Sequence, residues 1–171
     1  MHAPHPFPTK EKTKKLSLLF VCLGNICRSP AADGIMHKRV EDEGLSDRIT
    51  IDSAGTYGGH AGGLPDARMR QHAMRRGYEL THRARRVESS DFDRFDMILA
   101  MDDSNYDDLM RLAPDVASQK KIVRMVSFCT TTHWDHVPDP YYEGASGFEK
   151  VLDILEDACN GLLTEIKNNR L

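Results

Sequence analysis

Two side chains, Cys22 and Arg28, are the pair in this chain best suited to chemistry, and five residues separate them. An apolar run ends at Cys22, a short loop containing Gly24 follows, and Ser29 and Pro30 predict a helix with Pro30 at its first position. The backbone N–H groups of such a loop attract an anion, and a guanidinium matches two phosphate oxygens. The same positive field favours a cysteine thiolate, which can attack phosphorus.

Asp139 is the candidate proton donor for such a reaction. Expelling an alkoxide or a phenolate requires a positioned acid, which contributes about 10²- to 10⁴-fold. Pro138 and Pro140 stiffen the backbone around Asp139, and Tyr141 and Tyr142 follow directly. An Asp-Pro dipeptide by itself more often marks a turn. The cysteine loop elsewhere in the chain is what favours the catalytic role.

Apolar runs alternate with amphipathic stretches, which predicts an α/β fold. We expect strands at 16–22, 49–51, 95–100 and 121–126, and helices at 29–43, 65–77, 102–112 and 147–167. Ser146 and Glu149 predict a capping box for the last helix. We expect these elements to form a single-domain three-layer sandwich, a four-stranded parallel sheet flanked by helices. Ligands in such sheets bind at the carboxyl ends of the strands, where Cys22 lies.

Length and composition indicate one soluble globular domain. The chain has 171 residues, a net charge of −3 and a mean hydropathy of −0.51. Residues 1–14 lack a signal-peptide pattern, so we expect a disordered leader or a cloning remnant there, with the domain at 15–171. Four scattered cysteines indicate thiols in a reducing compartment, the cytoplasm.

Neither nucleic acid nor a membrane is an expected partner. No apolar run is long enough to span a bilayer. Seven arginines and one acid, Glu79, lie between residues 68 and 86, but the whole chain is slightly acidic, so we expect a solvated helix face. His133, Asp135 and His136 have no Cys or Glu at ligand spacing. We therefore expect no metal and no cofactor.

The motifs together resemble the low-molecular-weight protein tyrosine phosphatases, whose signature is a Cys, five residues and then Arg-Ser. The resemblance covers residues 16–167 and includes Asp-Ser-Ala-Gly at 52–55, His82 and Met-Asp-Asp-Ser-Asn at 101–105. In the last segment, Asp102 is expected only to cap a helix. The resemblance implies a flavodoxin-like strand order and hydrolysis of phosphotyrosine through a phosphocysteine on Cys22. It also implies that Asp139 protonates the leaving oxygen and later activates water.

The resemblance assigns further residues to the site. Asn25, Ser29, Ser53 and His82 are expected to support the loop by hydrogen bonds, with Ser29 donating to Cys22 and Asn25 in a left-handed conformation. The phosphate-binding loop comprises Leu23, Gly24, Asn25, Ile26, Cys27 and Ser29.

The resemblance also places the substrate cleft and a redox partner. Tyr141 and Tyr142 are expected to hold the phenyl ring of the substrate. Gly59 stands where the family usually has an aromatic residue, which implies a more open wall with Tyr57 as a partial substitute. Cys27 either forms a reversible disulfide with Cys22 or simply fills space.

Three alternatives to phosphotyrosine hydrolysis stay open. A protein-arginine phosphatase shares the scaffold, but the arginine phosphatases of this family carry Thr at the position of Ile26. A thiol-linked arsenate reductase needs resolving cysteines, and Cys129 and Cys159 form no close pair in sequence. A phosphate-binding module without turnover would need neither nucleophile nor acid. We therefore expect a phosphotyrosine protein or peptide as partner, and a monomer with at most weak self-association.

Overall fold

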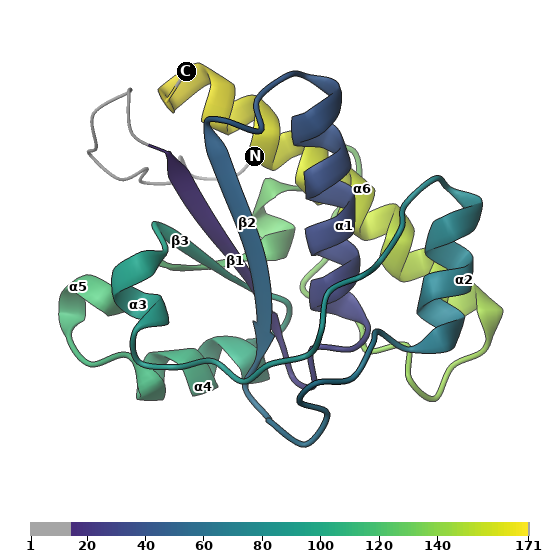
Figure 1. Cartoon of the computed structure of the whole chain (residues 1–171), viewed down its shortest axis with the longest axis horizontal. Helices are drawn as coiled ribbons and strands as arrows, with labels where there is room; N and C mark the ends of the chain where they lie inside the picture. The colour runs from purple at the N-terminus through teal and green to yellow at the C-terminus, as the bar shows by residue number, and fades with distance from the viewer. Residues whose placement is uncertain (1–14, 171) are drawn as a thin grey trace.

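Four parallel strands form the sheet at the centre of the protein. The computed structural model describes residues 15–170 (Figure 1), so the predicted leader at 1–14 lies outside the described residues. The strands are β1 (Leu16–Cys22), β2 (Ile49–Gly55), β3 (Met97–Ala100) and β4 (Ile122–Arg124). Their order is β2-β1-β3-β4 and every pair is parallel, which confirms the predicted α/β fold and its flavodoxin-like order.

Helices cover both faces of the sheet and complete the three layers (Figure 1). One face carries α1 (Arg28–Asp42) and α6 (Ala145–Arg170), with α2 (Ala67–Arg75) packed against α6. The opposite side carries α3 (Asp91–Arg94), α4 (Asp103–Leu112) and α5 (Val116–Gln119). None of the helices within 15–170 is long and apolar enough to cross a bilayer.

β1 fixes the site because it is buried on both of its faces. Leu18 and Phe20 pack into the cluster that includes α1 and α6, whereas Leu19 and Val21 pack into the cluster on the other face. A central strand covered on both sides needs a continuous apolar run, and this run ends at Cys22. The nucleophile candidate therefore stands at the end of a central strand that is buried on both faces.

The start of α1 differs slightly from the prediction. The helix begins at Arg28, so Pro30 is its third residue and not its first. The missing N–H of proline has no consequence at either place, because the first four N–H groups of a helix have no acceptor within it.

The predicted capping box of α6 is wrong. The helix begins at Ala145, which puts Ser146 inside the first turn. The side chain of Glu149 instead contacts His72, which lies on α2. It also accepts a hydrogen bond from Nη2 of Arg76, the residue that follows α2. Tertiary ion pairs have thus displaced the local cap that the sequence favours.

Several short elements were not predicted, and two strands are shorter than expected. α3 and α5 have four residues each, too few to show a helical period. β3 starts at Met97, and β4 ends at Arg124 where a 3₁₀ turn, η1 (Met125–Phe128), takes over. β2 is longer than expected and reaches Gly55.

The arginine-rich segment is not simply a solvated face. Arg76 pairs through Nη1 with Asp153 at 2.9 Å and with Glu156 at 2.5 Å, both on α6. Arg85 pairs at 2.9 Å with Asp91, whose side chain is fully buried. These arginines therefore link neighbouring elements within the fold.

Candidate active site

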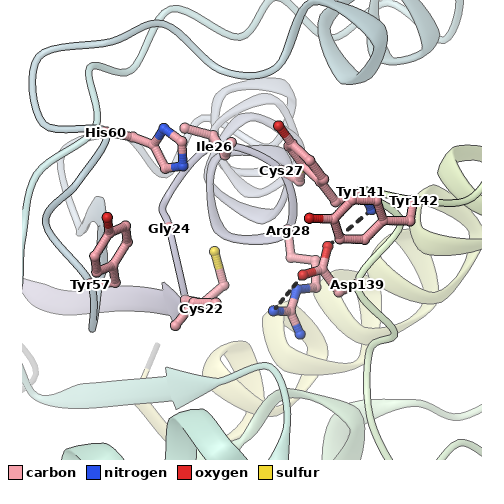
Figure 2. Close-up of a pocket in the computed structure, with 11 residues that line it drawn as sticks. Cys22, Gly24, Ile26, Cys27, Arg28, Tyr57, His60, Asp139, Tyr141 and Tyr142 are labelled. Atoms are coloured by element: carbon pink, nitrogen blue, oxygen red, sulfur yellow. Dashed lines mark hydrogen bonds and ion pairs between the residues drawn. The ribbon is translucent and has the colours of Figure 1, made fainter.

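A pocket of about 270 Å³ opens at the carboxyl end of β1 (Figure 2). Figure 2 shows Tyr57 and His60 on one side of Cys22, with Asp139 and the two following tyrosines on the other. The pocket brings together most of the predicted site residues and adds His60. Its lining consists of Cys22, Leu23, Gly24, Ile26, Cys27, Arg28, Tyr57, His60, Asp139, Tyr141 and Tyr142.

The loop after β1 is held by backbone hydrogen bonds from the end of β2. The carbonyl of Cys22 accepts from Thr56 N at 3.0 Å, and the carbonyl of Leu23 accepts from Tyr57 N at 2.8 Å. A Cβ atom at Gly55 would lie 2.6 Å from the Leu23 carbonyl oxygen. Glycine is therefore required at 55 for β2 and the loop to approach this closely.

Asn25 is the centre of a buried network beneath the loop. Its φ of 57° makes it the only non-glycine residue with a positive φ in the described part of the chain, which confirms the predicted left-handed conformation. Its Nδ2 donates to Ser29 Oγ at 2.7 Å and to Ser53 Oγ at 3.0 Å. Its Oδ1 accepts from His82 Nε2 and from Arg85 N, each at 3.0 Å. The amide uses its full hydrogen-bonding capacity.

The network ends at the sulfur of Cys22. Ser29 Oγ lies 3.0 Å from Cys22 Sγ. Because Asn25 already donates to this oxygen, the hydroxyl proton of Ser29 can point to the sulfur. Cys22 itself is only 3% exposed and is a free thiol.

Cys27 has a different environment although it lines the same pocket. Burial, and after it the negative charge of Asp66, raise the pKa of Cys27 well above its usual range. This thiol therefore stays protonated at neutral pH. Its role as redox partner of Cys22 stays a prediction.

Arg28 is buried and fixed by two acceptors. Its Nη1 donates to Asp102 Oδ2 at 2.7 Å and to the Val137 carbonyl at 3.0 Å, and its side chain is 3% exposed. Its Nη2 lies 3.9 Å from Asp139 Oδ2 (Figure 2). Burial opposes the charge, but the charge of Cys22 and the hydrogen bond to Asp102 raise the pKa of Arg28. The guanidinium is thus charged and held at the pocket.

Asp102 is a site residue whose contact with Arg28 was not predicted from the sequence. It does cap α4 as expected, because Oδ1 accepts from Asn105 N at 2.8 Å. Its Oδ2 holds Arg28 at the same time. The signal available in the sequence was its place two residues after the end of β3, at the same edge of the sheet as Cys22.

Asp139 lies on the exposed side of the pocket. Its side chain is 49% exposed, and Oδ1 accepts from Tyr141 N at 3.0 Å. A backbone hydrogen bond of 2.8 Å from Val137 to the Met101 carbonyl ties this segment to the end of β3. The rings of Tyr141 and Tyr142 stand edge to face with centroids 4.9 Å apart.

The opposite wall is formed by Tyr57 and His60, whose rings lie edge to face at 6.2 Å. A Cβ atom at Gly59 would stand 2.2 Å from the Tyr57 ring, so the ring covers the place where a side chain at 59 would be. Tyr57 therefore lines the pocket as expected. His60 was missed, and no motif in its loop points to it.

Comparisons with known proteins identify the family of this chain. Residues 17–171 match the family model described as low molecular weight phosphotyrosine protein phosphatase. The low molecular weight protein-tyrosine-phosphatase of Streptomyces coelicolor is 41% identical over 150 residues, which cover 86% of this chain and 92% of that protein.

Solved structures show the same relationship. A protein tyrosine phosphatase from Entamoeba histolytica is 48% identical with a TM-score of 0.88, over 92% of this chain and 100% of that one. A Drosophila arginine phosphatase is 32% identical with a TM-score of 0.83, over 89% and 98% of the two chains. The chain therefore belongs to the family of low molecular weight phosphotyrosine protein phosphatases.

Proposed function

We propose that this protein hydrolyses phosphotyrosine in proteins or peptides through a phosphocysteine on Cys22. One observation carries the proposal: a cysteine, a buried arginine and an aspartate, Cys22, Arg28 and Asp139, line one pocket. These are a nucleophile, a phosphate-binding cation and a proton donor. Residues 23–28 supply the backbone between nucleophile and cation.

In the first step, the Cys22 thiolate attacks the phosphorus of the bound substrate. The S–P bond forms as the bond from phosphorus to the tyrosine oxygen breaks, and Asp139 gives its proton to that oxygen. Arg28 and the loop N–H groups stabilise the charge on the equatorial oxygens. Before the attack, the hydroxyl of Ser29, 3.0 Å from the sulfur, stabilises the thiolate.

In the second step, water attacks the phosphocysteine. The Asp139 carboxylate left by the first step takes one proton from that water. The P–S bond breaks, inorganic phosphate leaves, and Cys22 returns as a thiolate. The half-exposed side chain of Asp139 suits this double role, because it can contact both a leaving group and a water molecule.

The walls of the pocket favour a phenyl ring over a guanidinium. Tyr57, Tyr141 and Tyr142 surround the entrance with aromatic surface. Ile26 lines the same pocket, and its branched chain narrows the space available to a flat, polar phosphoguanidinium. Because an arginine phosphatase has the same fold, the choice between the two substrates depends on these side chains.

An arsenate reductase is less well supported. Such a reaction needs resolving cysteines that relay a disulfide outward, but beyond Cys27 the remaining cysteines, Cys129 and Cys159, are buried in the core and do not line the pocket. Burial also raises the pKa of Cys129 to about 11. Asp139 would have no task in that reaction.

The test is phosphate release from a phosphotyrosine peptide and a phosphoarginine peptide, measured side by side with chelator present. We expect selective release from phosphotyrosine by the wild type and none by Cys22→Ser. Ile26→Thr is the matched variant, and it should shift the ratio of the two rates toward phosphoarginine. A wild-type preference for phosphoarginine would overturn the substrate assignment, and full activity of Cys22→Ser would overturn the mechanism.

A further inference from the structure

A second pocket, of about 300 Å³, lies behind the phosphate-binding loop and shares no lining residue with the first. Three potential metal ligands meet in it: Asp33 from α1, Asp52 from β2, and His82 from the segment after α2. One ligand atom of each lies within 4.8 Å of the other two. The reaction proposed above uses neither carboxylate.

The hydrogen bonds of Asn25 determine which nitrogen of His82 carries a proton. Nδ2 of Asn25 donates to Ser29 and Ser53, so Oδ1 can only accept. His82 Nε2, 3.0 Å from this oxygen, must therefore be the N–H donor. The other ring nitrogen, Nδ1, is left to face the two carboxylates.

The three ligand atoms lie close together, and a cation between them would balance the negative charges of the two carboxylates. His82 Nδ1 lies 3.5 Å from Asp52 Oδ1 and 3.7 Å from Asp33 Oδ2. Both distances are longer than in a direct charged N–H···O⁻ hydrogen bond, which is about 2.7–2.9 Å. Two ligands of a tetrahedral ion at about 2.1 Å stand about 3.4 Å apart, close to the observed distances.

We propose that Asp33, Asp52 and His82 bind a divalent transition-metal cation, for which Zn²⁺ is the fitting probe. Imidazole and carboxylate are the donor types that Zn²⁺ takes. Water would complete the coordination, since the exposed side chain of His37 lines the same pocket. The site is separate from the reacting atoms.

Each ligand is oriented by an outer partner, as in known metal sites. Asp33 Oδ1 is 2.7 Å from His37 Nδ1, and Asp52 Oδ2 accepts from Arg85 Nε at 3.1 Å. Asp52 Oδ1 also accepts from Ser53 N at 2.8 Å, which leaves it one lone pair for a metal. Glu79 is the remaining acidic residue that lines the pocket.

The proposed site is coupled to the loop through one residue. His82 contacts the metal position with Nδ1 and Asn25 with Nε2. A bound cation would fix the ring and with it the amide that supports Ser29 and Ser53. We therefore assign His82 a positioning role as well as a ligand role.

The experiment is a calorimetric titration of the full chain with Zn²⁺ in a Cys22→Ser background, which removes the thiolate that would compete for the ion. We expect one site whose affinity falls by at least about tenfold in Asp33→Asn and in His82→Gln. Gln at 82 can keep an N–H toward Asn25 while it lacks Nδ1. His136→Gln is the matched control and should leave the affinity unchanged. His2 and His5 are present in every variant, so they cancel in the comparison.

Two further readouts decide the outcome. Co²⁺ bound at this site should give visible bands without thiolate charge transfer, and they should be lost in Asp33→Asn. Thermal unfolding without metal checks that each variant is folded. If His82→Gln is not folded, the affinity of Asp33→Asn alone decides the test. Absence of Zn²⁺ binding, or binding that neither variant weakens, would overturn the proposal. Because no turnover is measured, either result leaves the proposed phosphatase activity to its own test.

Discussion

The two halves of the reaction pocket are held in place in different ways. On the phosphate side, the Asn25 amide makes four hydrogen bonds and the Arg28 side chain is 3% exposed. On the leaving-group side, Asp139 is 49% exposed as a side chain and Tyr142 is 95% exposed. The phosphate side meets the same phosphoryl group in every substrate, so a fixed array of donors serves it. The other side must admit different protein surfaces, and exposed side chains can adapt to them.

This difference predicts two kinds of mutational effect. Changes on the phosphate side should slow the reaction equally for all substrates. Changes on the leaving-group side should have effects that depend on the leaving group or on the rest of the substrate.

Asp139→Asn should have the largest of these effects. We expect kcat for a phosphotyrosine peptide to fall by about 10²- to 10⁴-fold, because the phenolate must leave without a proton. With p-nitrophenyl phosphate the rate of the first step should fall far less, because p-nitrophenol is more acidic than the phenol of tyrosine. Rapid-mixing measurement of the p-nitrophenol burst separates the two steps. Equal losses in the burst rate and in peptide turnover would show that Asp139 is not the acid.

Arg28→Lys should come next. Lysine keeps the charge but loses the planar fork, so we expect kcat/KM to fall by about 10²- to 10³-fold. The loss should be the same for p-nitrophenyl phosphate and for a phosphotyrosine peptide. A loss that differed strongly between the two substrates would contradict a purely phosphate-side role.

Asn25→Ala tests the network beneath the loop. Removing the amide leaves buried donors and acceptors unpaired, which costs about 1–3 kcal/mol of unfolding free energy. Ala also strains a backbone with a φ of 57°, whereas Asn25→Gly does not. Urea unfolding of both variants separates the two causes. Wild-type stability and wild-type kcat in Asn25→Gly would exclude a supporting role for the amide.

Tyr142→Ala should have the smallest effect. Tyr142 is 95% exposed and its ring stands edge to face with that of Tyr141, and such aromatic contacts contribute about 0.5–1.5 kcal/mol. We expect KM for a phosphotyrosine peptide to rise by about threefold to tenfold with kcat unchanged. Tyr142→Phe keeps the ring and is the control. A change in kcat for p-nitrophenyl phosphate would place Tyr142 in the chemistry and weaken the division into two halves.

Features that depend on one continuous segment could be predicted from the sequence. The apolar run of β1 and the residues after it predicted the strand and the loop, and the resemblance to the family added the left-handed Asn25. Asp139 was found because two prolines and two tyrosines mark its segment, although its distance of 3.9 Å from Arg28 was not predictable.

Features that depend on distant segments could not be predicted. Glu149 makes ion pairs with α2 in place of the capping box, and nothing near it in sequence indicates those partners. The contact of Asp102 with Arg28 arises because β1 and β3 are neighbours in the sheet. The cluster of Asp33, Asp52 and His82 likewise joins three separate elements.

The central claim is the covalent intermediate on Cys22, and it can be observed directly. Asp139→Asn should form the phosphocysteine from p-nitrophenyl phosphate but hydrolyse it slowly, because the base for the attacking water is missing. Intact-protein mass spectrometry after a rapid acid quench should then show one added phosphoryl group, located on Cys22 by peptide mapping. Turnover without any phosphorylated protein, or phosphorylation on another residue, would contradict the account.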